Sequence, residues 1–467
     1  MQSLLSRRDV FKLSAVGAAA MGRAAARPAG EIAVRVTAGT KRFAAAPPLQ
    51  WRPEGASSAE AIVVDPARTF QEMLGFGAAL TDSATYMMDQ LAPDARQRLI
   101  RRLFGPADLG FNVCRLSIGS SDYATKMYSY DEGDPDPDML RFSIDQDRKY
   151  TIPILKAARA VNPDLFLFAS PWSPPGWMKT GGSMLGGSMR KSHFAAYAKY
   201  FVKFLEAYAE AGVPIDAVTV QNEVDTDQDG RMPACLWGQE YEREFVSTHL
   251  GPALAERKLA TKIWILDHNY DLWGRAICEL DDPNVNRYVD GVAWHGYGGS
   301  PAAMTRVHEA HPEKHAYWTE GGPDINDPEY KTDWTKWSAT FAGILRNWAR
   351  AITGWNMALD EKGNPNIGPF PCGGLVTIDS KTKEITESGQ YWAFLHYSHA
   401  IRRGARRIES SGNLEGVAHA AFANPGGGAA IVLTNSGAER AVTLRMSGVE
   451  TAINLPAGSI VTLSTGI

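Results

Sequence analysis

The chain has 467 residues, of which 44% are hydrophobic and 21% are charged, a composition typical of a globular protein. Lys and Arg (48) nearly balance Asp and Glu (52), so the net charge of −4 gives no electrostatic reason to expect a nucleic-acid partner. The length allows two or three domains, although a (β/α)8 barrel takes ~250 residues as one unit.

The first thirty residues are expected to lie outside the fold. Arg7 and Arg8 form a twin-arginine pattern, an alanine-rich run follows, and Ala24–Ala26 offers small residues for cleavage. This pattern resembles a bacterial Tat export signal and predicts a periplasmic or secreted protein, with a basic N-terminal tail as the alternative. The apolar run is shorter than the ~20 residues of a membrane-spanning helix, and no other stretch of the sequence qualifies.

Four cysteines stand apart from one another, with no CxxC pair and no histidine cluster beside them. This spacing predicts neither a zinc site nor a disulfide framework, although a pair between Cys235 and Cys372 is left open. The sequence is also rich in aromatic residues, with 13 Trp and 16 Tyr. Some of these rings suit the apolar faces of sugars, and the others are expected in the core.

Strand patterns occupy both ends of the remaining chain. Residues 31–37 and 62–65 alternate as strands, with a proline- and alanine-rich loop expected between them. Short strands separated by Gly- and Asn-rich turns return near the C-terminus, at residues 417–423, 429–433, 441–446, 451–455 and 459–463. We therefore expect one β-sandwich built from residues 31–70 and 401–467.

Residues 71–400 alternate between buried strands and amphipathic helices. Pro93 and Pro153 stand near the starts of two predicted helices, a position that tolerates proline. Eight alternations predict a (β/α)8 TIM barrel, an α/β fold whose active-site residues stand at the C-terminal ends of the strands. The predicted strands are 73–80, 112–118, 165–171, 217–223, 262–267, 291–295, 316–319 and 351–356, and the predicted helices include 92–103, 152–161, 194–210, 240–254 and 334–350.

Polar and aromatic residues collect where these strands end. Any one of them could cap a loop, but eight sets in register predict a functional rim. The rim contains Thr81, Asp82, Arg115, Asp122, Trp172, Asn222, Glu223, Asp267, His268, Asn269, His295, Tyr297, Glu320, Trp355 and Asn356.

Two of these residues are carboxylic acids that suit the cleavage of a glycosidic bond. Glu223 follows the fourth strand and Glu320 the seventh, so they lie across the barrel mouth from one another. A retaining mechanism requires two carboxyl groups ~5–5.5 Å apart, and an inverting mechanism a wider gap. Asn222 is placed to bind a sugar 2-hydroxyl group, and His295 and Tyr297 to keep Glu320 ionised by donating to it. A structural ion pair is the alternative role for each glutamate.

Five segments extend this pattern beyond the glutamates: Phe70–Asp82, Ser170–Thr180, Tyr200–Ala209, Val220–Glu223 and Gly354–Leu359. In this order they resemble glycoside hydrolase family 30, with the nearest likeness to its glucosylceramidase branch. The resemblance implies a retaining β-glycosidase without metal or organic cofactor, acting on a carbohydrate or glycolipid. It implies Glu223 as the acid/base, Glu320 as the nucleophile, and sugar contacts from Asp122, Trp172, Asn222, Trp355 and Asn366.

Three departures from the lysosomal member of that family bear on the substrate. Gly296 stands where that member has Trp, Gly321 and Gly322 stand where it has Ala-Cys, and Val224 replaces Pro. The loop 225–231 is acidic and polar, whereas an enzyme that works at a lipid surface is expected to expose apolar loops. The glycine-rich rim and the polar loop favour a soluble glucoside or glucan, while the motifs themselves favour glucosylceramidase.

We therefore expect a β-glucosidase or glucosylceramidase-type activity ahead of an endo-β-1,6-glucanase or β-xylosidase. A silent carbohydrate-binding protein is the non-enzyme alternative, but a pure binder would not need both glutamates. A metal-dependent hydrolase would need a clustered His/Asp ligand set, which the sequence lacks. The aglycone, the choice among glucose, xylose and fucose, exo or endo action and the oligomeric state are left open.

Overall fold

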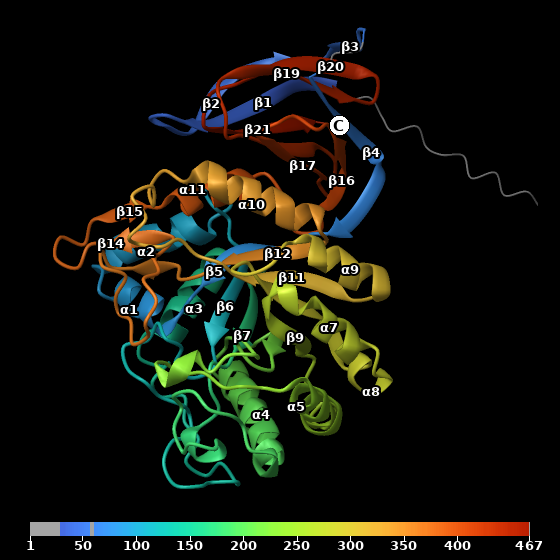
Figure 1. The fold of residues 1–467 in the computed structure, drawn as a ribbon. Helices are drawn as coiled ribbons and strands as arrows, with labels where there is room; N and C mark the ends of the chain where they lie inside the picture. The colour runs from blue at the N-terminus through green and yellow to red at the C-terminus, as the bar shows by residue number, and fades with distance from the viewer. Residues whose placement is uncertain (1–28, 57–59, 467) are drawn as a thin grey trace, which may run out of the picture.

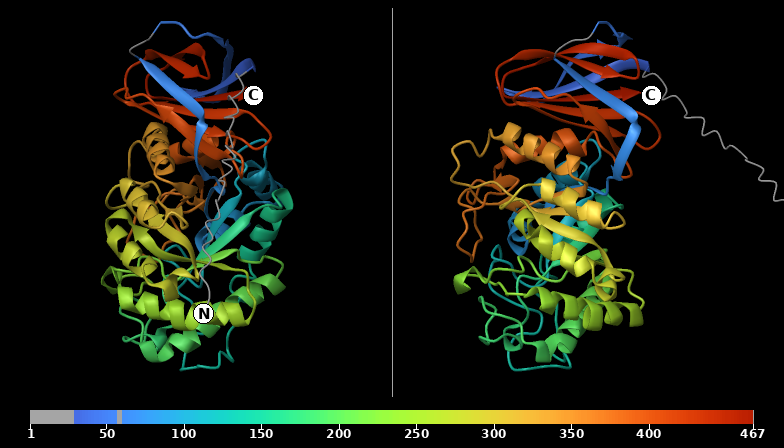
Figure 2. Two further views of the ribbon diagram at one scale, coloured as in Figure 1. Left: turned by 90° about the vertical axis from the view of Figure 1, so that its right-hand side faces the viewer. Right: turned by 45° about the vertical axis from the view of Figure 1, so that its right-hand side comes forward.

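The computed structural model describes residues 29–56 and 60–466, which form a barrel with a β-sandwich stacked against one side of it (Figure 1). The long strand β4 (Ala61–Glu72) runs from the sandwich towards the barrel, as both views of Figure 2 show. Most of the predicted export signal lies outside the described residues. Within 29–56 and 60–466, no helix combines the length and the apolar character needed to cross a membrane.

Eight parallel strands close the barrel, and strands that are neighbours in the chain are neighbours in the barrel. The last strand pairs with the first, through Ala351 with Gly75 and Gly354 with Ala78, which confirms the predicted (β/α)8 fold. The strands are β5 (Gly75–Ala79), β6 (Val113–Ser117), β7 (Phe166–Ser170), β8 (Ala217–Thr219), β9 (Lys262–Asn269), β10 (Val289–His295), β11 (His315–Glu320) and β12 (Ala349–Gly354).

The helices follow the strands and surround the barrel (Figure 1). The helix predicted over 240–254 is divided in three, because a π-helical turn (Phe245–Leu250) separates α5 from α6. The helix predicted over 334–350 ends earlier, at Arg346, because β12 begins at Ala349. The helices are α1 (Asp82–Asp89), α2 (Pro93–Phe104), α3 (Thr151–Val161), α4 (Phe194–Glu210), α5 (Gln239–Glu244), α6 (Gly251–Glu256), α7 (Trp273–Leu280), α8 (Pro283–Asn286), α9 (Ala302–Ala310), α10 (Trp334–Arg346) and α11 (Gly389–Ser398).

The inside of the barrel has an apolar layer and a polar layer. Near the start of the strands, Trp264 stacks on Tyr317 with ring centroids 3.9 Å apart and contacts Phe168 at 4.9 Å. These rings fill the interior, as the side chains of a small barrel must. Further along the strands the interior becomes polar, with Arg115 and Asp267 both fully buried. The candidate site stands on this polar layer.

The sandwich is one ten-stranded sheet in the order β2-β1-β21-β18-β17-β16-β4-β19-β20-β3, and it encloses its own apolar core. Strands from the two ends of the chain pair directly, β1 (Ala29–Ala38) with β21 (Ser459–Gly466), which confirms that both termini build it. The other strands are β2 (Lys41–Gln50), β3 (Arg52–Pro53), β16 (Arg406–Ser411), β17 (Val417–Ala423), β18 (Ala429–Asn435), β19 (Arg440–Met446) and β20 (Val449–Leu455), and a separate small sheet contains β13 (Ala358–Leu359), β14 (Val376–Ile378) and β15 (Ile385–Glu387).

The prediction of a continuous loop between the first two strands is wrong, because residues 41–50 form β2. This strand lies at the end of the sheet order and pairs only with β1 among the described strands. An edge strand tolerates Pro47 and Pro48 because one side of it makes no ladder hydrogen bonds. The proline content that argued for a loop is therefore compatible with this position.

Helices α10 and α11 join the barrel to the sandwich (Figure 1). Trp334 donates from its indole nitrogen to the carbonyl oxygen of Gly458 at 3.0 Å. His396 contacts the hydroxyl groups of Thr37 at 2.8 Å and Thr462 at 2.7 Å. Burial lowers the pKa of His396 to about 3, so this ring stays neutral between the two bodies.

Candidate active site

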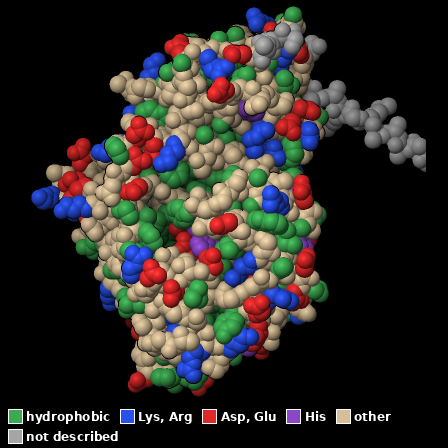
Figure 3. Space-filling view, viewed as in Figure 1, with side chains coloured by type: hydrophobic (Ala, Val, Ile, Leu, Met, Phe, Trp, Pro, Cys, Tyr) green, Lys and Arg blue, Asp and Glu red, His purple; other side chains and the backbone are tan. Residues whose placement is uncertain are grey.

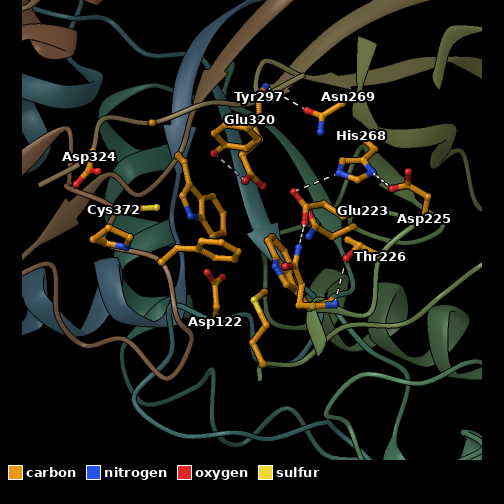
Figure 4. A pocket seen from close by; sticks show the side chains of 18 of the residues that line it. Asp122, Glu223, Asp225, Thr226, His268, Asn269, Tyr297, Glu320, Asp324 and Cys372 are labelled. Atoms are coloured by element: carbon orange, nitrogen blue, oxygen red, sulfur yellow. Dashed lines mark hydrogen bonds and ion pairs between the residues drawn. The ribbon is translucent and has the colours of Figure 1, made fainter. Parts of the chain in front are cut away.

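A cavity of about 620 Å³ opens at the C-terminal ends of the barrel strands. In the space-filling view the molecule is hollowed beside apolar, acidic and histidine side chains (Figure 3), and Figure 4 shows the cavity from close by. This volume lies within the range of ligand sites in proteins. The residues that line it are Asp122, Trp172, Asn222, Glu223, Asp225, Thr226, Gln228, Met232, His268, Asn269, Tyr297, Glu320, Gly322, Pro323, Asp324, Trp355, Phe370, Pro371 and Cys372.

The two predicted catalytic glutamates face each other in this cavity. Glu320 is the last residue of β11, and oxygen atoms of Glu320 and Glu223 lie within 4.8 Å of one another. Strand β8 ends at Thr219, so the prediction that it extends to Glu223 is wrong. Instead Glu223 has a left-handed backbone (φ 57°), and its N–H donates to the carbonyl oxygen of Asp267 at 3.0 Å. A non-glycine residue in this conformation is strained, which is common at functional sites.

Glu320 is surrounded by hydrogen-bond donors. The buried guanidinium of Arg115 donates to Oε2 of Glu320 and forms an ion pair with it. The hydroxyl group of Tyr297 donates to Oε1 at 3.0 Å, and Nε2 of His295 lies 3.9 Å from Oε2. Donors of this kind favour the ionised carboxylate, as a nucleophile requires.

Asp267 connects the groups beneath the two glutamates. Its carboxylate accepts from Arg115 at 2.7 Å and lies 3.1 Å from Nε2 of His295. Hydroxyl groups of Ser170, Thr219 and Thr319 each donate to it at 2.7 Å. Burial raises the pKa of Asp267, but the charge of Arg115 and these hydrogen bonds outweigh burial and hold the pKa well below its ordinary value.

His295 is buried beneath the carboxylates and does not line the cavity. Its Nδ1 lies 3.5 Å from Oε1 of Glu223. Burial lowers the pKa of His295, but Glu320, Asp267 and Glu223 more than reverse this effect and raise the pKa to about 9. His295 therefore lies behind the carboxylates, where it approaches Glu320 as the sequence predicted, and it makes no part of the cavity wall.

Glu223 has neutral and ionisable neighbours of its own. Nε2 of Gln228 donates to Oε2 of Glu223 at 2.7 Å, and Nε2 of His268 lies 3.6 Å from Oε1. Burial raises the pKa of Glu223, while the contacts with His295 and His268 lower it, and the balance lies below the ordinary value. Gln228, on the loop after Glu223, was outside the site predicted from the sequence, whereas His268 at the end of β9 belonged to the predicted rim.

Two tryptophans form an aromatic wall of the cavity. The rings of Trp172 and Trp355 stack with centroids 5.1 Å apart and an interplanar angle of 20°. Behind them, the guanidinium carbon of Arg115 lies 4.7 Å from the Trp172 ring centroid. Flat rings of this kind suit the C–H faces of a sugar, as the sequence predicted for both residues.

Polar groups of the predicted sugar contacts also reach the cavity. Oδ1 of Asp122 is buried without a hydrogen-bond partner in the described structure. Burial, followed by the charges of Glu320 and Glu223, raises the pKa of Asp122 well above its ordinary value. Asn222 lines the cavity and accepts from Arg115 at 2.8 Å through Oδ1. A hydroxylated ligand would satisfy such groups.

Asn366 is not among the residues that line the cavity. Its amide nitrogen donates to the carbonyl oxygen of Phe370 at 2.7 Å, and its amide oxygen accepts from Gly368 at 2.7 Å. The loop thus uses both ends of this side chain, and its predicted sugar contact has no support from this geometry.

Packing explains why positions 321 and 296 are glycines in this structure. A side chain at either position would collide with the buried ring of Trp318, which packs against both. The glycine-rich rim therefore reflects the space that Trp318 occupies, and it does not by itself indicate the substrate.

Neither a disulfide nor a separate cluster of metal ligands adds to the site. The four cysteines are unpaired, so the pair left open between Cys235 and Cys372 does not form. Among the described residues, the one group of His, Cys, Asp and Glu side chains close enough for an ion is Glu223, His295 and Glu320. Arg115 already supplies positive charge to Glu320 there.

Comparison with known proteins identifies the family of both the barrel and the sandwich. The model of the glycosyl hydrolase family 30 TIM-barrel domain matches residues 73–401, and that of the glycosyl hydrolase family 30 β-sandwich domain matches residues 404–463.

Curated relatives carry two different activities in their names. "Putative glucosylceramidase 3" of Caenorhabditis elegans is 34% identical over 80% of this chain and 75% of its own length. An endo-1,6-β-D-glucanase of Neurospora crassa is 32% identical over 81% of this chain and 82% of its own. A solved endo-β1,6-glucanase superposes with a TM-score of 0.85 at 29% identity and covers 94% of this chain and 100% of its own. The chain therefore belongs to glycosyl hydrolase family 30, and it is a glycoside hydrolase.

Proposed function

We propose that the protein is a retaining β-glucosidase. The observation that carries this proposal is the approach of the Glu223 and Glu320 oxygens to within 4.8 Å. Retaining enzymes place their carboxyl groups ~5–5.5 Å apart, whereas inverting enzymes leave room for a water molecule between them.

In the proposed reaction, Glu320 attacks the anomeric carbon while Glu223 transfers its proton to the leaving glycosidic oxygen. This step breaks the glycosidic bond and forms an ester between Glu320 and the sugar. Glu223, now ionised, takes a proton from water as the water attacks the same carbon. The sugar leaves with its original configuration, and Glu320 is released as a carboxylate. Arg115 and Tyr297 support the charge that Glu320 carries before and after this cycle.

The lining of the cavity favours a neutral substrate. It contains five carboxylic acids and, among the lining residues that the structure describes, no Lys or Arg. A uronic acid or a phosphorylated sugar would meet these acids without a cation to pair with. Of the large apolar side chains exposed in the described structure, Tyr297 (51%) and Phe370 (37%) line the cavity. This small apolar area supports a soluble glucoside ahead of a lipid in a bilayer.

An endo-β-1,6-glucanase is the second candidate. The cavity extends from the tryptophan wall to Asp225, Thr226 and Gln228 on the polar loop. Its volume of about 620 Å³ supports binding of more than one sugar ring. The relatives named endo-1,6-β-glucanases support the same substrate.

A panel of substrates tests both candidates. It contains aryl β-glucosides, β-xylosides and β-fucosides together with glucosylceramide and a β-1,6-glucan. Hydrolysis of β-glucosides with retained configuration, lost in Glu320→Gln, is expected, because the nucleophile is removed. The matched control is Glu329→Gln, which neutralises an exposed glutamate outside the cavity. Near-full activity of Glu320→Gln, or an inverted product, would refute the proposal.

We further propose export through the N-terminal twin-arginine segment. Replacing Arg7 and Arg8 by lysine should retain the protein in the cytoplasm of a bacterium with a Tat system. Cell fractionation measures this, and unchanged export of the variant would contradict it.

A further inference from the structure

Two residues beside Glu223 have no role in the reaction described above. Oδ1 of Asp225 lies 2.5 Å from Nδ1 of His268, and Nε2 of His268 lies 3.6 Å from Oε1 of Glu223. Figure 4 shows the three side chains in a row along one wall of the cavity. Asp225 lies two residues after Glu223 in the chain. His268 lies in β9, the strand that pairs with β8 in the barrel.

The two ends of this row have different surroundings. The side chain of Asp225 is 43% exposed, whereas that of His268 is only 8% exposed. The close contact with His268 lowers the pKa of Asp225, so this group is an anion beside the ring. An anion at Nδ1 fixes the ring and leaves Nε2 directed at Glu223.

We propose that Asp225 and His268 are positioning residues that control the protonation of Glu223 during the double displacement. Nε2 of His268 faces the proton of Glu223 that the first step uses. After that proton has passed to the leaving oxygen, Glu223 takes a proton from the attacking water, and Nε2 of His268 faces the restored carboxyl group. Asp225 holds the ring in both states. This inference rests on the proposed acid/base role of Glu223.

The other histidine near Glu223 is bound differently. His295 contacts Asp267 at 3.1 Å within the buried layer and also approaches Glu320, so it serves both catalytic groups. Of the two catalytic glutamates, His268 forms an ion pair only with the acid/base Glu223 in the described structure. The titratable and charged groups that face Glu223, His268 or Asp225 are Asp122 after β6, Asp267 in β9, Arg275 in α7, His295 in β10, Tyr297 after β10 and Glu320 in β11.

Substrates with different leaving groups test this inference. In His268→Gln, kcat/KM for an alkyl β-glucoside should fall about 10–100-fold, because its leaving oxygen needs the proton of Glu223. For 2,4-dinitrophenyl β-glucoside, which departs without a proton, kcat/KM should change by less than about threefold. The basic limb of the pH profile for the alkyl substrate should move, because Oε1 of Glu223 loses its contact with Nε2 of His268.

A double-mutant cycle tests the part of Asp225. Asp225→Asn should shift the pH profile in the wild-type background and much less in the His268→Gln background, because it acts through the ring. The matched control is Asp229→Asn, which removes the same charge from the same loop at a side chain that is 86% exposed and outside the cavity.

The outcomes separate this inference from the proposed function. If the wild-type enzyme cleaves no β-glycoside, the proposed function fails. If it does, and His268→Gln and His268→Asn keep the wild-type ratio between the two substrates, the positioning role is refuted. Equal effects of Asp229→Asn and Asp225→Asn would also refute it. Retained activity on the dinitrophenyl substrate shows that the variants are folded.

Discussion

The hydroxyl group of Tyr297 donates to Oε1 of Glu320 at 3.0 Å, although 51% of the tyrosine is exposed at the cavity mouth. A hydrogen bond to a charged group contributes about 1.5–3 kcal/mol. Tyr297→Phe should therefore lower kcat/KM on an aryl β-glucoside about 10–100-fold while leaving the fold intact. Steady-state kinetics and thermal melting measure the two effects. Tyr288→Phe is the control, because Tyr288 lies outside the cavity, and an unchanged kcat/KM for Tyr297→Phe would contradict the prediction.

Replacement of Glu223 by glutamine should separate the two steps of the reaction. Glu223→Gln keeps the shape of the side chain but cannot transfer a proton, so kcat/KM on an alkyl β-glucoside should fall about 10²–10⁴-fold. The dinitrophenyl glucoside should still form the ester with Glu320, which then accumulates because no base activates water. Added azide needs no base, so it should restore turnover and give β-glucosyl azide. Product analysis measures this, with Glu240→Gln as an exposed control. A failure of azide to give that product would contradict the role of Glu223.

Loss of the Asp267 charge should destabilise the barrel. Asp267→Asn leaves Arg115 buried with one anionic partner fewer and removes the partner of His295. Breaking a buried ion pair costs about 3–5 kcal/mol, and denaturant unfolding of the variant should show a loss of this size. Asp281→Asn removes a carboxylate that is 65% exposed and pairs with His311, so it should cost less than about 1 kcal/mol. Equal stability of the two variants would show that Asp267 is not the centre of this layer.

The barrel could be predicted because its strands and helices have different periods in the sequence. Buried strands read as short apolar runs and the helices repeat at helical spacing, so their order alone indicates the fold. Strand β2 was missed because Pro47 and Pro48 argue against a strand unless the strand lies at an edge. Which strand is an edge depends on pairing between the two ends of the chain, and a local pattern does not contain that information.

The sequence predicts the chemistry of the candidate site better than it predicts the contacts between the residues of that site. The predicted strand ends identify Glu223 and Glu320. Arg115 lies inside β6, and its role as the partner of Asp267 and Glu320 becomes clear only from the folded structure. The sequence separations of these pairs are 152 and 205 residues, so no local pattern predicts them. The sugar contact of Asn366 was predicted only from the resemblance to the family. In the structure, hydrogen bonds within its own loop determine where its amide group lies.

Stability should depend on pH through His295. Its pKa is raised from 6.5 to about 9 in the folded protein, where Glu320, Asp267 and Glu223 overcome the effect of burial. A raised pKa means that folding favours the imidazolium, so its contribution is complete below about pH 6.5 and is lost as the pH rises through about 9. At 1.36 kcal/mol for each pKa unit, this contribution is about 3 kcal/mol. Urea unfolding at pH 6 and pH 9.5 should therefore show that the wild-type advantage over His295→Gln shrinks at the higher pH. The exposed His399→Gln variant should keep a constant difference from the wild type, and a constant difference for His295→Gln as well would show that His295 is not charged in the folded protein.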